Sequence, residues 1–159
     1  MKKLADSLAL LAVTAWAGAL WGVGYLAVPV LFKTLSDKML AGELAGKMFT
    51  LVAITGIVCA AYLLIYYFSA HGRATPQHIG FRLVVIMLVL ALIVQFGLQP
   101  AMAGLKAQAL PLEVMKSPLA GRFGMLHGIS SVCYLVQSLL AVMLVIRRQA
   151  SPVPQNDIN

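Results

Sequence analysis

One histidine stands out as a residue that could do chemistry. His127 is the single Asp, Glu, Lys, Arg or His residue within the four long apolar segments of the chain. An ionisable side chain at membrane depth is costly, so it commonly marks a functional site. Ser130, Ser131, Tyr134 and Ser138 follow it at helical offsets and form a polar stripe. An imidazole beside hydroxyl groups can hold a small solute or an ion, or can hydrogen-bond neighbouring helices together.

Further polar residues are expected at the depth of His127, which lies about one turn into its segment. The preceding apolar segment runs in the opposite direction, which brings Gln95 and Gln99 to a similar level on one face. Tyr25 and Thr55 reach this level from the first two segments. The predicted cluster in the outer half of the bundle therefore consists of Tyr25, Thr55, Gln95, Gln99, His127 and Ser131.

Two interpretations of this cluster remain open. Polar side chains join transmembrane helices by hydrogen bonds that contribute about 0.6–2 kcal/mol each, and we favour this role. The alternative is a vestibule for a ligand or ion. In either case we expect His127 to point into the bundle and to bond Gln99, Gln95 or Ser131.

The sequence gives little support for enzymatic or cofactor chemistry. Cys59 and Cys133 lie within apolar segments and lack the Cys or His spacing of a zinc site. His71 and His78 flank a polar loop at the opposite end of the membrane crossings from His127. His127 therefore cannot share one haem with either of them. We interpret both as solvated loop residues, and we predict no cofactor, no metal site and no enzymatic activity.

Composition explains why a membrane must surround these residues. The chain is 61% hydrophobic and 11% charged, whereas soluble domains have about 25% charged residues. The formal net charge is +7, and the cations flank the apolar segments instead of forming a basic stripe. We therefore expect the lipid bilayer to be the partner of these cations, and we expect no nucleic-acid binding.

The apolar residues form four runs, each long enough to cross a hydrocarbon core of about 30 Å. Their predicted bounds are 7–32, 48–70, 83–105 and 123–146. The predicted fold class is all-α, an integral membrane four-helix bundle in one domain over residues 7–146. We expect the first helix to remain uncleaved, because its apolar run continues well beyond the length of a signal core.

Local signals describe the connections between these spans. Ser36-Asp37 is typical of a helix start, so we expect a short amphipathic surface helix within 33–47, continuous with the second span. Thr75-Pro76 predicts the start of the third helix near Pro76. Pro29 and Pro100 are expected to kink or stop their helices. The tail over 151–159 is expected to be disordered and cytoplasmic.

Small residues predict where helices approach closely. Gly18-x-x-x-Gly22 in the first span, and Gly42 and Gly46 before the second, are spaced as in close-packed transmembrane helices. We expect these glycines to pack helices within the chain or against a second copy or a membrane-protein partner. The Lys and Arg pairs beside the first and last spans favour an inner-membrane protein with both termini in the cytoplasm.

Three segments resemble a known family. They are Trp21–Phe32, with Trp-Gly followed by Val-Pro-Val-Leu-Phe, then Ala41–Phe49, and Arg122–Ser130, with Phe-x-x-Leu-His-Gly-x-Ser. Together they resemble the transmembrane protein 205-like family of bacterial four-span proteins. The resemblance implies a four-helix membrane domain without an assigned reaction. It also directs attention to Gly22, Pro29, Phe32, Gly42, Gly46, Phe49, Phe123, Leu126, His127 and Ser130.

These observations favour a non-enzymatic membrane module that acts by packing or assembly. The alternative is a permeation or binding module for a small solute or soft metal, built on the outer polar cluster. A haem- or quinone-linked redox protein is a third and weaker interpretation.

Overall fold

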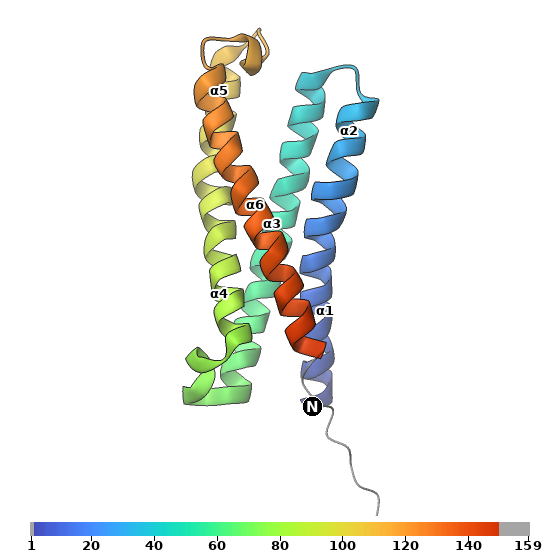
Figure 1. Ribbon diagram of the computed structural model, residues 1–159, viewed down its shortest axis with the longest axis vertical. Helices are drawn as coiled ribbons and strands as arrows, with labels where there is room; N and C mark the ends of the chain where they lie inside the picture. The colour runs from blue at the N-terminus through green and yellow to red at the C-terminus, as the bar shows by residue number, and fades with distance from the viewer. Residues whose placement is uncertain (1, 150–159) are drawn as a thin grey trace, which may run out of the picture.

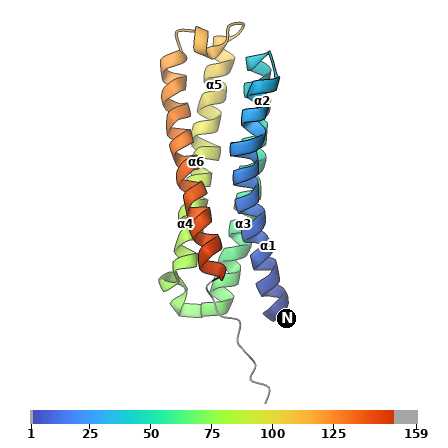
Figure 2. The ribbon, with the colours of Figure 1, turned by 45° about the vertical axis from the view of Figure 1, so that its right-hand side comes forward.

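The computed structural model describes residues 2–149, which form four antiparallel crossings joined by short connections (Figures 1 and 2). The predicted tail over 151–159 lies outside the described residues. The first crossing comprises α1 (Lys2–Trp21), the π-helix η1 (Gly22–Ala27) and α2 (Val28–Thr34), and the second is α3 (Lys38–His71). The third comprises α4 (Ile79–Leu92), the π-helix η3 (Ile93–Leu98) and α5 (Gln99–Ala109), and the fourth is α6 (Ala120–Gln149). The 3₁₀ helices η2 (Gly72–Gln77) and η4 (Val114–Lys116) lie in two of the connections.

All four crossings are long and apolar enough to span a bilayer. The described residues contain no strand, and the predicted all-α membrane bundle is confirmed. The chain is a multi-pass membrane protein.

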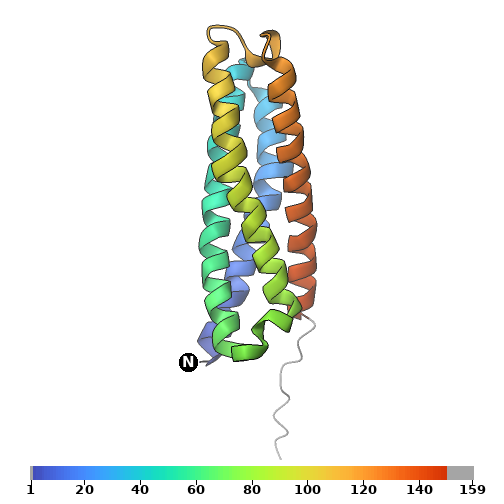
Figure 3. The same ribbon diagram turned by 90° about the vertical axis from the view of Figure 1, so that its left-hand side faces the viewer.

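The crossings form a ring in which each helix packs against two neighbours. α1 and α4 each pack on both α3 and α6, as the side view in Figure 3 also shows. The main apolar core lies in one half of the bundle's length and includes residues from all four crossings. This half contains Lys2, the connection between α3 and α4, and the end of α6. We call it the closed half. Its largest fully buried side chains include Trp16, Leu20, Leu63 and Met87.

The opposite half has few fully buried side chains. No residue of η1, α2 or η3 is buried, and toward this end the α2–α3 pair diverges from the α5–α6 pair (Figure 1). We call this end the open half; it comprises residues 22–51 and 93–134. The open half lies at the level where the polar cluster was predicted.

Each proline-containing crossing passes from the closed to the open half through a π-helical segment. The N–H of Val28 donates to the carbonyl of Val23, and the N–H of Gln99 donates to the carbonyl of Val94. Each of these hydrogen bonds joins a residue to the fifth residue before it, as in a π-helix. Pro29 and Pro100 follow directly and lack an N–H. Widening the helix before proline gives the freed backbone groups new partners. The helices therefore continue to Thr34 and Ala109, so of the two predicted outcomes, a kink or a stop, the stop occurs at neither proline.

One of the two other predicted helix starts is confirmed and the second is wrong. Asp37 caps α3, with its carboxylate accepting from the N–H groups of Met39 (2.8 Å) and Leu40 (3.1 Å). The helix predicted within 33–47 is the first part of α3 and is continuous with the second span, as expected. Thr75 does not cap the third crossing, because its buried hydroxyl donates back to Tyr67 and α4 begins only at Ile79.

Candidate functional site

His127 does not point into a polar cluster, and the expectation that it bonds a glutamine or Ser131 through its ring is wrong. The imidazole is exposed and lies parallel to the ring of Phe123, one turn earlier in α6, with centroids 5.9 Å apart. The Ser131 hydroxyl donates to the backbone carbonyl of His127 (2.9 Å) and not to the ring. Within residues 2–149 the imidazole has no hydrogen-bond partner.

The other predicted polar residues are also spread over several environments. Tyr25 is 49% exposed and its ring contacts Tyr134 edge-on, while Thr55 lines a groove of about 190 Å³ between the first crossing and α3. Gln95 and Gln99 are half-buried, and the carbonyl oxygen of Gln95 is buried without a partner among the described residues. The structure therefore does not assemble one cluster from these side chains.

Tyr134 joins the first and fourth crossings at the boundary between the two halves. Its hydroxyl donates to the backbone carbonyl of Leu20 in α1, and its ring lies 5.2 Å from that of Phe49 and 6.2 Å from that of Tyr25. The contact requires Gly24, because a Cβ there would lie 2.6 Å from the tyrosine oxygen. These aromatic rings form the floor of the open half.

Lys106 connects the two diverging helix pairs near the membrane surface. Its ammonium donates to the carbonyl of Gly42 at the start of α3 (3.1 Å) and lies 5.7 Å from the centre of the Phe123 ring in α6. Lys106 thus brings together segments that the sequence resemblance had marked, Gly42 in one and Phe123 in another. Both contacts are with neutral groups.

The charge of Lys106 has no carboxylate in contact with it within residues 2–149. Glu43 is adjacent to Gly42 in the chain, but its carboxylate pairs with Lys47 at 2.7 Å, and both of these side chains are largely exposed. An ammonium group has three donors, and one of those on Lys106 is used. The open half therefore offers a half-buried cation with unused donors to any anion that enters between the helix pairs.

Lys106 was missed from the sequence because the third span was predicted to end at Leu105, which assigned the lysine to a loop. Helix α5 instead continues to Ala109, and Gln99, Met102 and Lys106 share one of its faces. Their spacing of three and four residues was a usable signal. A helix that contains two alanines after Lys106 had no reason to stop there.

The four predicted packing glycines do not join helices within the chain. A Cβ built on Gly18, Gly22 or Gly46 has no neighbour within 4 Å, and one on Gly42 would meet only the Lys106 ammonium, at 3.7 Å. Close approaches occur instead at glycines that lie against aromatic rings. They are Gly24 against Tyr134, Gly56 against Trp16 and Gly80 against Tyr67.

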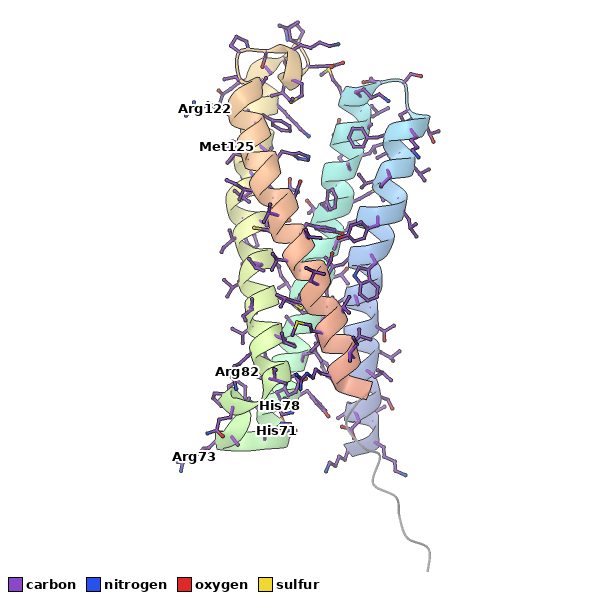
Figure 4. All side chains as sticks on the ribbon, in the orientation of Figure 1. His71, Arg73, His78, Arg82, Arg122 and Met125 are labelled. Carbon is purple, nitrogen blue, oxygen red and sulfur yellow. The ribbon has the colours of Figure 1, made fainter. Side chains whose placement is uncertain are left out.

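A second groove, of about 290 Å³, lies between α5 and α6. It is lined by Ala101, Leu105, Gln108, Arg122, Met125 and Leu126. Figure 4 shows Arg122 and Met125 on the side of α6 that faces away from the α2–α3 pair. This groove is therefore separate from the space that Lys106 bridges.

The family model described as "Domain of unknown function (DUF4149)" matches residues 11–111. The chain belongs to this family. The DUF4149 match includes Tyr25, Gly42 and Lys106 but ends before α6, so Phe123 and Tyr134 lie beyond it. No curated protein and no solved structure matches the chain.

Proposed function

We propose that this DUF4149 protein is a non-enzymatic membrane module that binds a small or amphipathic anion between the helix pairs of its open half. The single observation that carries the proposal is Lys106, a half-buried cation that contacts a neutral carbonyl and a neutral ring. A half-buried charged group near the membrane surface is stabilised by a counter-charge in direct contact. Glu43 acts on the Lys106 ammonium only at longer range, and an anionic ligand would provide the direct contact.

The surroundings of Lys106 favour a ligand with an apolar tail. The helix pairs diverge toward the end of the bundle that carries Lys106 (Figure 1), and the apolar rings of Tyr25, Phe49 and Tyr134 contact one another at the start of this half. A chain entering from the lipid would contact these rings while its anionic head met the ammonium. No proton-transfer or nucleophilic residue is needed for such binding.

Dodecanoate binding to the purified protein in neutral detergent tests this function. A hydrogen bond to a charged group contributes about 1.5–3 kcal/mol, so Lys106→Gln should weaken the affinity by about 10- to 150-fold. Lys116→Gln is the matched control, because Lys116 lies at the same end of the bundle in the connection after α5, is exposed and pairs with Glu113 at 3.3 Å. Equal affinities for the two variants, or no binding of dodecanoate by the wild type, would reject the proposal.

A second candidate function, self-association, rests on two open glycines of the first crossing, Gly18 in α1 and Gly22 in η1. Both have space for a Cβ, so a second helix could approach the first crossing there. Gly22→Leu should reduce dimerisation measured by sedimentation in detergent, and Gly104→Leu should not. Both sites are open in the single chain, so a loss of stability in the monomer is expected for neither. Unchanged sedimentation of Gly22→Leu would reject this candidate.

We further infer an inner-membrane location with both termini in the cytoplasm, together with a closer relationship to transmembrane protein 205-like proteins. The Lys2-Lys3 and Arg147-Arg148 pairs and the arginines of the α3–α4 connection support this orientation. A cysteine placed at Ala74 should resist a membrane-impermeant thiol reagent added to intact cells. Strong labelling from outside would reverse the orientation.

A further inference from the structure

The connection between α3 and α4 brings two histidines into contact that are seven residues apart. α3 ends at His71, Gly72 turns the chain with a φ of +51°, and η2 follows. Thr75 is fully buried, and its hydroxyl donates to the carbonyls of Gly72 (2.6 Å) and Tyr67 (3.2 Å). This tight turn places the imidazoles of His71 and His78 side by side, with centroids 4.4 Å apart.

The nitrogen atoms of this pair are incompletely used. His71 Nδ1 lies 3.3 Å from the carbonyl of Tyr67 and donates to it, which leaves its Nε2 without the proton in the neutral ring. His78 packs on the Tyr67 ring at 5.0 Å, and its Nδ1 is buried without a partner among the described residues. Burial lowers the pKa of His78, and the neighbouring His71 lowers it further.

The same connection carries positive charge without any acid. Arg73 lies in η2 and Arg82 in the first turn of α4, and the Arg82 guanidinium donates a 2.8 Å bond to the carbonyl of Gln77. Figure 4 shows Arg82, His71 and His78 at this end of the bundle, and Arg73 at the same end with its side chain extending outward. The sequence has no Asp or Glu between Glu43 and Glu113.

Neighbouring elements add few charges at this end. α1 contributes Lys2, Lys3 and Asp6, and α6 contributes Arg147. The Asp6 carboxylate accepts a 2.6 Å bond from the hydroxyl of Tyr66 on α3, so this acid already has a donor.

We propose that the α3–α4 connection is a phosphate-binding site, in which Arg73 and Arg82 bind the anion and the His71–His78 pair takes up a proton as it binds. Guanidinium groups match phosphate oxygens in geometry, and a protonated imidazole adds a charged donor. The site lies where two membrane crossings end, which is the level of lipid headgroups. It is independent of the anion site proposed at Lys106, which lies at the other end of the bundle.

A metal ion fits this site less well than phosphate. Two imidazoles supply two ligands, but two arginines repel a cation. No group of three or more His, Cys, Asp or Glu residues that could hold a metal occurs in the described part of the chain. A phosphate group would instead compensate the proton that burial and the neighbouring ring disfavour on His78.

Calorimetric titration of the full chain in neutral detergent tests the site, with dihexanoyl phosphatidic acid and inorganic phosphate as separate probes. Uptake of one proton by the histidine pair predicts affinity that is about tenfold higher at pH ~6 than at pH ~7.5, after correction for the second ionisation of the probe, which falls in the same interval. Arg82→Gln should weaken binding at both pH values by about tenfold or more. The double change His71→Gln and His78→Gln should preserve binding at the higher pH and leave only the pH dependence of the probe's own second ionisation.

Arg122→Gln is the matched control, because Arg122 is an exposed arginine at the opposite end of the bundle. Binding of the lipid probe without binding of inorganic phosphate would identify a headgroup as the ligand, and equal binding of both would identify a soluble phosphate. The proposal is overturned if neither probe binds, if Arg122→Gln and Arg82→Gln weaken binding equally, or if the histidine changes leave the pH dependence intact. Tight Zn²⁺ binding that the histidine changes remove, without phosphate binding, would replace it with a metal site.

Discussion

The contact between Gly56 and Trp16 gives the sharpest test of the closed half. Trp16 is 1% exposed, and its ring fills the space that a side chain on Gly56 would occupy. In Gly56→Ala the new methyl would lie 2.8 Å from Cε2 of Trp16 and closer still to Nε1. Ordinary carbon contacts are about 3.5–4.0 Å, so α1 and α3 must separate by roughly 1 Å.

Overpacking of this kind costs about 1–3 kcal/mol in well-packed interiors. The matched control is Gly18→Ala, which adds the same methyl to α1 at a position where nothing lies within 4 Å. Both changes alter the helix propensity of a glycine in the same way, so their difference isolates the steric effect. We expect Gly56→Ala to unfold at a lower fraction of sodium dodecyl sulfate than Gly18→Ala, by about 1–3 kcal/mol in the free energy of unfolding.

Equal unfolding free energies for the two variants would refute this reasoning. The result would mean that the Trp16 ring can move without loss of packing, and that the closed half is not the stable core of the bundle. Emission of Trp16 in a Trp21→Phe background provides a second readout, because displacement of the buried indole should shift its spectrum in Gly56→Ala and not in Gly18→Ala.

Three further changes test other contacts. Tyr134→Phe removes the hydrogen bond to Leu20 but keeps the ring, so stability should fall by about 0.6–2 kcal/mol in detergent unfolding; an unchanged value would show that this bond contributes nothing. Lys106→Met removes the hydrogen bond to Gly42, so spin labels at the open-half ends of α3 and α5 should report a longer distance than in the wild type. An unchanged distance would show that this hydrogen bond does not hold the two helices together. Because the pKa of His78 is lowered in the folded protein, stability in lipid-free neutral detergent should be full above about pH 6.5 and decline below it, as the unfolded state binds the proton first. His78→Gln should flatten this decline in melting temperature, and an identical decline in that variant would assign it to another group.

The architecture was predictable from sequence because a bilayer leaves few choices. Long apolar runs without charges must be helices, and short polar connections force neighbouring runs to be antiparallel. The same runs say little about rotation, because nearly every side chain in them is apolar. The direction of the His127 side chain was therefore inferred only from its depth in the membrane and from the free-energy cost of an ionisable group in lipid. In the structure its ring neighbour is Phe123 and not a glutamine.

The candidate site was less accessible to sequence reasoning, for two physical reasons. Lys106 was assigned to a loop because an apolar run ends where the first charge appears, although the helix itself continues to Ala109. The contact between His71 and His78 depends on a turn held by the buried hydroxyl of Thr75, and that hydroxyl was read as a helix cap. The spacing motifs selected glycines such as Gly18 and Gly22 that have no neighbouring helix within 4 Å. The glycines that do allow close approach, such as Gly56, are determined by which aromatic ring lies opposite them, and spacing does not show this.

The π-helical segments before Pro29 and Pro100 have a consequence for how each crossing presents its surface. Each segment holds one residue more than an α-helix would need for the same rise, so every side chain beyond it is turned by about 100° relative to the helix before it. A single helix thus has two independently set orientations, one that serves the packed core and one that serves the open end. Substitutions on one side of the π-helical segment can then accumulate without re-aiming the residues on the other. Removing one residue from 22–27 or 93–98 would be more disruptive than many substitutions, because it would rotate a whole helix end at once.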